Sequence, residues 1–323
     1  MTDAGWVVGV DSGGSGLRIA LARAYDARPV ETVTSGEPVR TGPGGIEAAH
    51  LLAQVLPAVE AMLGRAGAAD VSALAVGAAG MATLGDELRA VLPGALDRAL
   101  GVRRLALAAD AVTAYAGALG QRPGAVVAGG TGLIALGTDL TSWRRADGWG
   151  HLLGDCGSGA WIGRAGLEAA MRAFDGRRGG SPALLARAEA RFGPATGLPG
   201  ALYPRTDRPA VLASFAPEVA HCATVGDEVS TGILRRAAAH VAEAAAAVCP
   251  VTGASEVALT GGLFKMGDPL LVPLRAQLAE QLPHARPTSA AGDPLAGSLA
   301  IAGWLATDTL RLPTEPQLLQ LAR

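Results

Sequence analysis

Three aspartates stand in settings that favour chemistry over packing. Asp11 opens the stretch 11–15, Asp-Ser-Gly-Gly-Ser, directly after an apolar run. Asp110 follows another apolar run, and Asp155 lies in the segment 148–163, which contains six glycines and two tryptophans. Glycine at this density weakens a helix or strand, so it indicates a backbone that turns sharply or approaches a ligand closely. Carboxylates in such places can bind a cation, accept hydrogen bonds from hydroxyls or take a proton.

The stretch 11–15 lies between the apolar runs 6–10 and 17–22, a pattern typical of a β-hairpin with a glycine turn. Glycines let backbone N–H groups face a phosphate with no Cβ in the way. The phosphate-binding candidates of this turn are Gly13, Gly14 and Ser15. Asp11 is a candidate for holding Mg²⁺ through water, because this cation prefers carboxylate and phosphate oxygens. A plain turn is the alternative, since Asp and Gly are common in turns.

The strand–glycine–strand pattern recurs at 125–137, around Gly-Gly-Thr-Gly at 129–132. Two such turns in one chain favour a pair of phosphate cradles over two plain turns. The candidates of the second turn are Gly130, Thr131 and Gly132. A third glycine pair, Gly261 and Gly262, follows a predicted strand at 256–259, where a flat base can approach the backbone. An ordinary strand-to-helix turn is the alternative there.

Asp110 ends a predicted strand at 104–109 and precedes a predicted helix at 111–119. A carboxylate in this position is a candidate general base, which takes a proton from a hydroxyl as that hydroxyl attacks a phosphoryl group. The alternative is an N-cap for the helix, a position that Asp favours.

The segment 148–163 supplies candidate substrate contacts. Asp155 can accept hydrogen bonds from two hydroxyls, and Trp149 can offer its indole face. The candidate substrate-binding residues are Trp149, Gly150, His151 and Asp155. A metal set of His151, Asp155 and Cys156 is disfavoured, because no second Cys/His cluster completes a tetrahedral site.

The apolar periodicity predicts an α/β protein with a repeated organisation. Residues 1–119 follow the order β-β-β-α-β-α-β-α, and the following residues partly repeat it. Residues 193–208 are predicted to form a surface excursion or lid, and 208–223 a single helix. The C-terminal segment 308–323 is expected to pack back on the first half, with a short helix at 313–323.

Composition excludes several classes of partner. The chain has 323 residues, a net charge of −2 and no run of Lys or Arg, which argues against nucleic-acid binding. No charge-free apolar run reaches the ~18 residues that span a bilayer, and no basic segment precedes the apolar start. Three cysteines without paired spacing indicate free thiols in a reducing compartment. We therefore expect a cytoplasmic protein with no membrane partner.

The motifs together resemble one family. The segments that carry the resemblance are Val8–Ser15, Ala109–Ala111, Val126–Gly132, Gly148–Ser158 and Leu259–Gly262. In order and spacing they are similar to the N-acetylglucosamine kinase branch of the BadF/BadG-type ATPase family, within the superfamily of sugar kinases, heat-shock chaperone ATPases and actin. The most specific part is Gly-Trp-Gly-His-x-x-Gly-Asp-x-Gly-Ser at 148–158. ROK-type sugar kinases would carry a cysteine-rich zinc motif, which this sequence lacks.

The resemblance implies two RNase-H-like (actin-like ATPase) lobes, each a mixed sheet flanked by helices, with a cleft between them. The lobes would comprise residues 1–119 and 120–307. The cleft would hold ATP with Mg²⁺ and an amino sugar, and the protein would be a homodimer. The product would be a hexosamine 6-phosphate.

The same resemblance implies a role for each candidate residue. Asp11 would assist Mg²⁺, and the turns 13–15 and 130–132 would hold phosphates. Asp110 would be the catalytic base. The residues at the sugar would be Trp149 and Asp155, and those near the adenosine would be Gly261 and Gly262.

Two departures bear on the choice of sugar. N-acetylglucosamine kinases of this family usually carry an Asn in the loop after the third strand, and the loop 36–42 has none here. The segment 77–80, Gly-Ala-Ala-Gly, also lacks a serine that can stand there. The sequence is similar to the actinobacterial glucosamine kinases of the group, so we expect glucosamine first and N-acetylglucosamine second. Glu168 and Asp175 are candidates to face an ammonium at C2, and two solvated surface carboxylates are the alternative.

Two functions from other classes use the same scaffold. A non-catalytic sugar or nucleotide sensor would not need a base, so the three aspartates together argue against it. An ATPase that activates another enzyme would carry cysteines for an iron–sulfur cluster, which the three scattered cysteines do not match.

Overall fold

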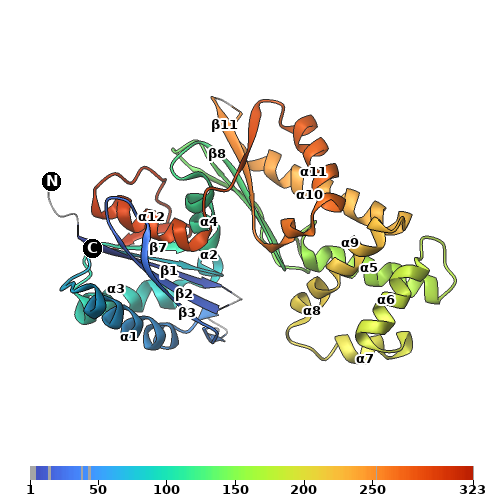
Figure 1. Cartoon of the computed structure of the whole chain (residues 1–323), viewed down its shortest axis with the longest axis horizontal. Helices are drawn as coiled ribbons and strands as arrows, with labels where there is room; N and C mark the ends of the chain where they lie inside the picture. Colours follow the sequence, from blue (N-terminus) through green and yellow to red (C-terminus); the bar gives the residue numbers. More distant parts are fainter. Residues whose placement is uncertain (1–4, 14–15, 38, 43–44, 252, 323) are drawn as a thin grey trace. The chain divides into compact units, whose positions relative to one another are not determined.

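The computed structural model describes residues 5–13, 16–37, 39–42, 45–251 and 253–322 (Figure 1). Gly14 and Ser15, two of the predicted phosphate contacts, lie outside the described residues. The chain divides into two compact units. The first comprises Met1–Gly124, Thr138–Trp143 and Ser289–Arg323, and the second comprises Ala125–Gly137 and Arg144–Thr288.

The first unit is built on a mixed sheet with the strand order β13-β7-β6-β1-β2-β3. Its strands are β1 (Trp6–Gly13), β2 (Gly16–Arg23), β3 (Pro29–Ser35), β6 (Ala73–Ala78), β7 (Leu105–Ala109) and β13 (Leu319–Ala322). β1, β2 and β3 form an antiparallel meander, whereas β1, β6 and β7 run parallel. Every residue of β6 and β7 is buried, as expected of central parallel strands covered on both faces. A small additional ladder joins β4 (Thr41–Gly42) and β5 (Gly45–Ile46).

The helices of the first unit are α1 (Ala48–Ala66), α2 (Met81–Leu84), α3 (Asp86–Leu100), α4 (Asp110–Leu119) and α12 (Pro294–Ala306). α12 packs on α4 and β1, although it comes late in the chain (Figure 1). Small residues permit this approach: a Cβ on Gly9 would lie 2.7 Å from the backbone nitrogen of Leu299. The unit therefore includes residues that the sequence assigned to the second lobe, because close packing binds α12 to the first sheet.

The C-terminal residues correct one prediction. They pack back on the first unit as expected, but Leu319–Ala322 form a strand, β13, where a helix was predicted. β13 pairs antiparallel with β7. Without it, the outer edge of β7 would present unpaired backbone N–H and C=O groups, which a strand satisfies and a helix cannot.

The second unit repeats the strand order of the first, as β10-β9-β8-β11-β12. Its strands are β8 (Gly124–Gly129), β9 (Leu133–Thr138), β10 (Trp143–Asp147), β11 (Ser255–Thr260) and β12 (Ala285–Ser289). β1 lies next to β6 in the first sheet, and β8 lies next to β11 in the second. In each sheet, therefore, the first of three consecutive strands pairs with a strand from later in the chain. Two mixed sheets flanked by helices confirm the predicted fold class. β12 was not predicted; Pro287 and the polar residues around it give it no apolar alternation.

The helices of the second unit are α5 (Gly159–Phe174), α6 (Pro182–Phe192), α7 (Leu198–Leu202), α8 (Arg208–Ser214), α9 (Ala216–Thr224), α10 (Glu228–Val248) and α11 (Asp268–Gln281). The predicted single helix at 208–223 is wrong, because the chain breaks at the buried Phe215 into α8 and α9. Pro217 cannot donate the N–H that a continuous helix needs, but it fits the first turn of a new one. The predicted excursion at 193–208 contains α7 and a short 3₁₀ turn at Ala195–Gly197.

Within the described part of the chain, no helix is both long enough and apolar enough to cross a lipid bilayer.

Candidate active site

The first glycine hairpin places Asp11 opposite Arg18 in the register of β1 and β2. Side chains opposite one another in an antiparallel pair share a face and lie within reach. Arg18 donates from Nε, at 3.1 Å, and from Nη2, at 2.5 Å, to the same oxygen, Oδ2 of Asp11. The hairpin thus carries its own counter-charge, which the sequence showed only as an arginine interrupting an apolar run.

Asp11 is largely buried, with 13% of its side chain exposed. Burial raises the pKa of this carboxyl above its ordinary value, and the hydrogen bond and charge of Arg18 oppose that rise. The other oxygen, Oδ1, accepts no hydrogen bond from any residue that the structure describes.

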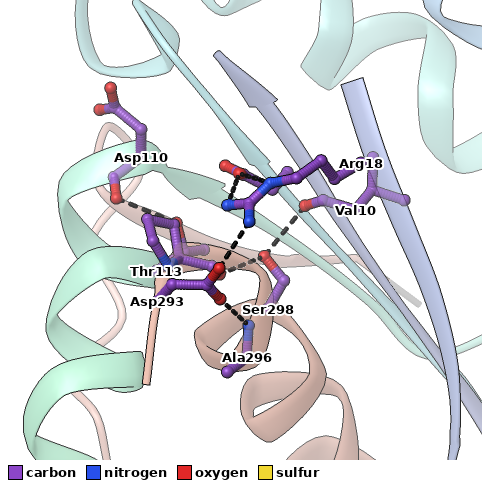
Figure 2. A network of polar contacts seen from close by, with 9 residues as sticks. Val10, Arg18, Asp110, Thr113, Asp293, Ala296 and Ser298 are labelled. Atoms are coloured by element: carbon purple, nitrogen blue, oxygen red, sulfur yellow. Dashed lines mark hydrogen bonds and ion pairs between the residues drawn. The ribbon is translucent and has the colours of Figure 1, made fainter. Parts of the chain in front are cut away.

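A second carboxylate, Asp293, completes the network (Figure 2). Nη1 of Arg18 donates to its Oδ2 at 2.5 Å. Oδ1 of Asp293 accepts the N–H of Ala296 at 3.0 Å and so caps α12. One turn later the hydroxyl of Ser298 donates to the carbonyl of Val10 in β1, at 2.9 Å. The sequence analysis did not select Asp293, although an aspartate before Pro and an apolar run is a recognisable helix start.

Asp110 lies at the same edge of the sheet as Asp11. Ser12, Ala78 and Ala109 are level in the parallel registers of β1, β6 and β7, and Asp110 follows directly. With neighbouring strands ~4.8 Å apart, the two aspartates are separated by two strand spacings, or roughly 10 Å. The carboxyl ends of parallel strands are the usual ligand edge of such a sheet.

Asp110 is the first residue of α4, and Ala109 holds the N-cap position that the alternative assigned to the aspartate. Oδ1 of Asp110 accepts the N–H of Ala111 at 2.8 Å, and its carbonyl accepts the hydroxyl of Thr113 at 2.9 Å. In Figure 2 its carboxylate points away from Arg18. None of these contacts tests whether Asp110 acts as a general base, so that role stays a prediction.

In the second unit, the turn Gly130–Gly132 is docked on the start of α5. The carbonyl of Gly130 accepts the N–H of Gly159 at 2.9 Å, and that of Thr131 accepts the N–H of Ala160 at 3.0 Å. N–H groups in the first turn of a helix have no partner within the helix, so these bonds satisfy them. The turn is held through its carbonyls, while the side chain of Thr131 is exposed.

Asp155 lies against this turn. A Cβ built on Gly132 would lie 2.5 Å from Oδ2 of Asp155, closer than real side chains approach. The other carboxylate oxygen, Oδ1, accepts the N–H of Gly150 at 3.1 Å. The carboxylate in this position leaves no room for a side chain at position 132, and the glycine turn and the loop 148–163 meet in one place.

Burial and backbone donors shift the pKa of Asp155 in opposite directions, and burial has the larger effect. Its side chain is buried, and its backbone has a φ of 55°, in the left-handed region. Burial raises the pKa of this carboxyl, the N–H groups of Gly150 and Leu133 lower it, and the nearby charge of Asp147 raises it.

Asp147, which the sequence analysis did not select, anchors the loop. Its carboxylate accepts the backbone N–H of Asp155 and, at 2.9 Å, that of Cys156. Its own φ of 64° turns the chain directly after β10. An acidic residue directly before a glycine-rich loop was the available signal, since Asp tolerates this conformation and bonds nearby backbone.

Trp149 is 60% exposed and stacks against Arg145, whose guanidinium carbon lies 4.1 Å from the ring centroid. Arg145 also donates to the carbonyl of Gly148 at 2.7 Å, which orients it. His151 is half-buried, and Gly150 has a φ of 83°, which suits glycine. The indole is therefore held on one side and presented to solvent on the other.

The third glycine pair lies against the second turn. Gly261 has a φ of 101°, and a Cβ there would collide with the carbonyl of Gly129. Gly262 borders a cavity of about 460 Å³ between α9 and the start of α11. Lys265, the only lysine in the chain, also lines this cavity. The volume lies within the range of small-molecule sites, roughly 300–1,000 Å³.

The residues around Asp11 fit Mg²⁺. This ion usually takes one or two carboxylates and completes its shell with phosphates and water. Oδ1 of Asp11 provides one such oxygen. Across the described ranges, no group of three or more His, Cys, Asp or Glu side chains could hold a metal by itself, including the set around His151 and Cys156. The donor set suits a cation that arrives with a phosphate ligand.

Of the two carboxylates considered for the C2 position, Glu168 lines a cavity of about 240 Å³, where Arg172 lies beside it. Glu168 accepts a hydrogen bond from Arg172 at 3.1 Å, one turn along α5. Asp175 follows the end of α5 and is exposed. Both match the alternative of solvated surface groups.

Comparison with known proteins agrees with these features. The model of the BadF/BadG/BcrA/BcrD ATPase family matches residues 8–291. An N-acetylmuramic acid/N-acetylglucosamine kinase from Clostridium acetobutylicum is 30% identical over 174 residues, 53% of this chain. The match spans 55% of that relative, about half its length.

Solved structures extend the likeness over the whole fold. A Chromobacterium violaceum protein provisionally named an N-acetylglucosamine kinase has a TM-score of 0.72 and 32% identity, over 92% of this chain and 98% of its own. A ROK family glucokinase from Streptomyces griseus, with glucose and AMPPNP, has a TM-score of 0.54 and 21% identity, over 92% and 98% of the two chains, and shows the fold alone. With its two repeated sheets and its glycine turns in family order, the chain belongs to the BadF/BadG/BcrA/BcrD ATPase family.

Proposed function

We propose that the protein is an ATP-dependent hexosamine kinase that phosphorylates the 6-hydroxyl of glucosamine, with N-acetylglucosamine as the alternative substrate. The observation that carries the proposal is the contact between Asp155 and Gly132. A carboxylate suited to sugar hydroxyls lies against a glycine turn suited to phosphate. Family membership and the likeness to the Clostridium and Chromobacterium proteins support a sugar kinase.

In this proposal the phosphates of ATP lie on the turn Gly130–Gly132, and its adenine base lies at Gly262 beside the cavity. Asp155 accepts hydrogen bonds from sugar hydroxyls, and the exposed face of Trp149 packs on the ring. Mg²⁺, held with the help of Asp11, supplies charge neutralisation for the phosphates. Asp110 takes the proton from the 6-hydroxyl.

The proposed preference for glucosamine follows from the loop 36–42, which lacks the Asn of N-acetylglucosamine kinases. An ATP-consumption assay over glucosamine, N-acetylglucosamine, N-acetylmannosamine, N-acetylmuramic acid and glucose tests it. We expect kcat/KM for glucosamine to exceed that for the N-acetylated sugars by about tenfold or more, because an N-acetyl group without its Asn partner would lose a hydrogen bond in the site. A higher value for N-acetylglucosamine would reverse the order, and sugar binding without turnover would indicate a sensor.

Replacement of Asp110 tests the base. We expect Asp110→Asn to lower kcat by about 10²- to 10⁴-fold while ATP affinity stays within about twofold, because general base catalysis contributes on this scale. Asp86 is the matched control, since it is also the first residue of a helix and carries an exposed carboxylate. Substantial turnover by Asp110→Asn, or an equal loss in Asp86→Asn, would contradict the assignment.

We also propose that the kinase is a cytoplasmic homodimer, on the strength of the sequence resemblance. Sedimentation velocity of the purified chain tests the dimer, and a concentration-independent monomer would contradict it.

A further inference from the structure

Arg18 is the one cation between two carboxylates in the described network (Figure 2). A guanidinium commonly pairs with both oxygens of a single carboxylate in a parallel fork. Here Nε and Nη2 converge on Oδ2 of Asp11, and Nη1 turns to Asp293. This division leaves Oδ1 of Asp11 without a hydrogen bond from the described residues.

Contacts at the start of α12 hold Asp293, the second partner of Arg18, in place. Asp293 is the N-cap of α12, and its second oxygen is engaged by Ala296. A Cβ on Gly117 of α4 would collide with the carbonyl of Asp293, so the backbone there is tightly enclosed. Arg18 therefore joins the β1–β2 hairpin to the tightly packed start of α12.

The charges explain why the bridge matters. With both carboxylates ionised, the trio carries a net charge of −1, which still attracts a cation. Without the guanidinium, the part-buried Asp11 and the exposed Asp293 would be two like charges with no counter-charge between them, which disfavours their present positions.

We propose that Arg18 is a positioning residue for the Mg²⁺·nucleotide site: it orients the Asp11 carboxylate so that Oδ1 faces the ligand, and it ties strands β1 and β2 to the start of α12. The inference rests on the proposed function for the role of Asp11. It assigns to Arg18 no contact with the ligand, so its effect depends on Asp11 being present.

Binding of Mn²⁺·ADP, followed by water proton relaxation, tests this without turnover. We expect Arg18→Met to weaken Mn²⁺·ADP binding by about 10- to 100-fold, the scale of one charge-assisted hydrogen bond, with metal-free ADP changed less than about twofold. Arg18→Lys should recover part of the loss, because a single ammonium keeps the charge but cannot span both carboxylates. Arg65→Met removes an exposed arginine paired with Glu31 and is the control.

A double-mutant cycle separates positioning from general structural support. In an Asp11→Asn background, Arg18→Met should cost no more than about twofold further, because its target is already lost. Asp293→Asn keeps the cap oxygen but turns an amide toward Arg18, so it should cost a few-fold in Mn²⁺·ADP binding.

Additive losses in the cycle, or equal losses with and without the metal ion, would overturn the proposal. If Arg18→Met does not fold by circular dichroism, Arg18→Lys carries the same cycle. If the wild type binds Mn²⁺·ADP but phosphorylates no sugar, the proposed function fails while the role of Arg18 is still decided. If it does not bind Mn²⁺·ADP, both fail.

Discussion

The two glycine hairpins occupy equivalent places in their sheets, yet each associates with a carboxylate in a different way. In β1–β2 the carboxylate is part of the hairpin, and a guanidinium from the opposite strand stabilises it. In β8–β9 the turn carries no acid of its own, and Asp155 comes from a later loop and accepts backbone N–H groups. One carboxylate depends on a side-chain partner, and the other depends on the path of the backbone.

This difference predicts how each site fails. The Asp11 site is vulnerable to side-chain changes at Arg18, because a buried charge without its partner is costly. The Asp155 site is vulnerable to added volume at glycines, because backbone donors cannot be mutated but can be displaced. Duplicated architecture has thus produced two carboxylates that resemble one another only in burial.

Among the changes that test this comparison of the two hairpins, Gly132→Ala should have the strongest effect. The added Cβ would displace Asp155 from the turn. A misplacement on the order of 1 Å can cost about 10²-fold in rate, so we expect kcat/KM for the sugar to fall on this scale. Steady-state kinetics with the preferred sugar measures it.

Gly200→Ala is its matched control. Gly200 lies in α7 of the same unit, and a Cβ there meets no atom within 4 Å. We expect its kinetics to match the wild type. If the two variants have the same kcat/KM for the sugar, the contact between Asp155 and Gly132 does not contribute to catalysis.

The second prediction assigns a different substrate to each carboxylate. Asp155→Asn should raise KM for the sugar by about 10- to 100-fold, as for lost hydrogen bonds to a charged group, and leave KM for Mg²⁺·ATP within about threefold. Asp11→Asn should show the opposite pattern. If both variants affect the same KM, the two carboxylates do not serve separate ligands.

The smallest expected effect is a pH dependence of stability. Burial raises the pKa of Asp155 above its ordinary value of 3.8, so the folded state takes up this proton more readily than the unfolded state. The stabilisation is complete below 3.8 and is lost as the pH rises through the folded-state pKa. The free energy of unfolding of wild type minus that of Asp155→Asn should therefore increase from about pH 7 toward about pH 4. Urea unfolding at both values measures it.

Asp139 provides a control of opposite sign. Hydrogen bonds from Thr141 and Ser142 lower its pKa to about 2, so its contribution is present above 3.8 and is lost as the pH falls through about 2. The corresponding difference for Asp139→Asn should stay nearly constant from about pH 7 to about pH 4 and decrease only below about pH 4. A difference for Asp155→Asn that also decreases would show that burial does not dominate at Asp155.

Much of this organisation could be predicted from local patterns. The strand–glycine–strand repeats and the position of Asp110 after β7 are consequences of short-range sequence and of parallel topology. The tail could not be predicted, because β13 forms only where β7 offers a free edge. The break at Phe215 depends on a side chain that the core of the second unit buries completely.

The local sequence was enough to identify the candidate reactive residues: three aspartates, three glycine turns and the loop 148–163. Spacing and backbone freedom encode these features, and both are local. Tertiary structure alone decided the partners: Arg18 with Asp11 and Asp293, Asp147 beneath the loop, and Asp155 against Gly132. A buried carboxylate is stabilised by whichever donors folding brings to it, and these come from strands, helices and loops that the linear order keeps apart.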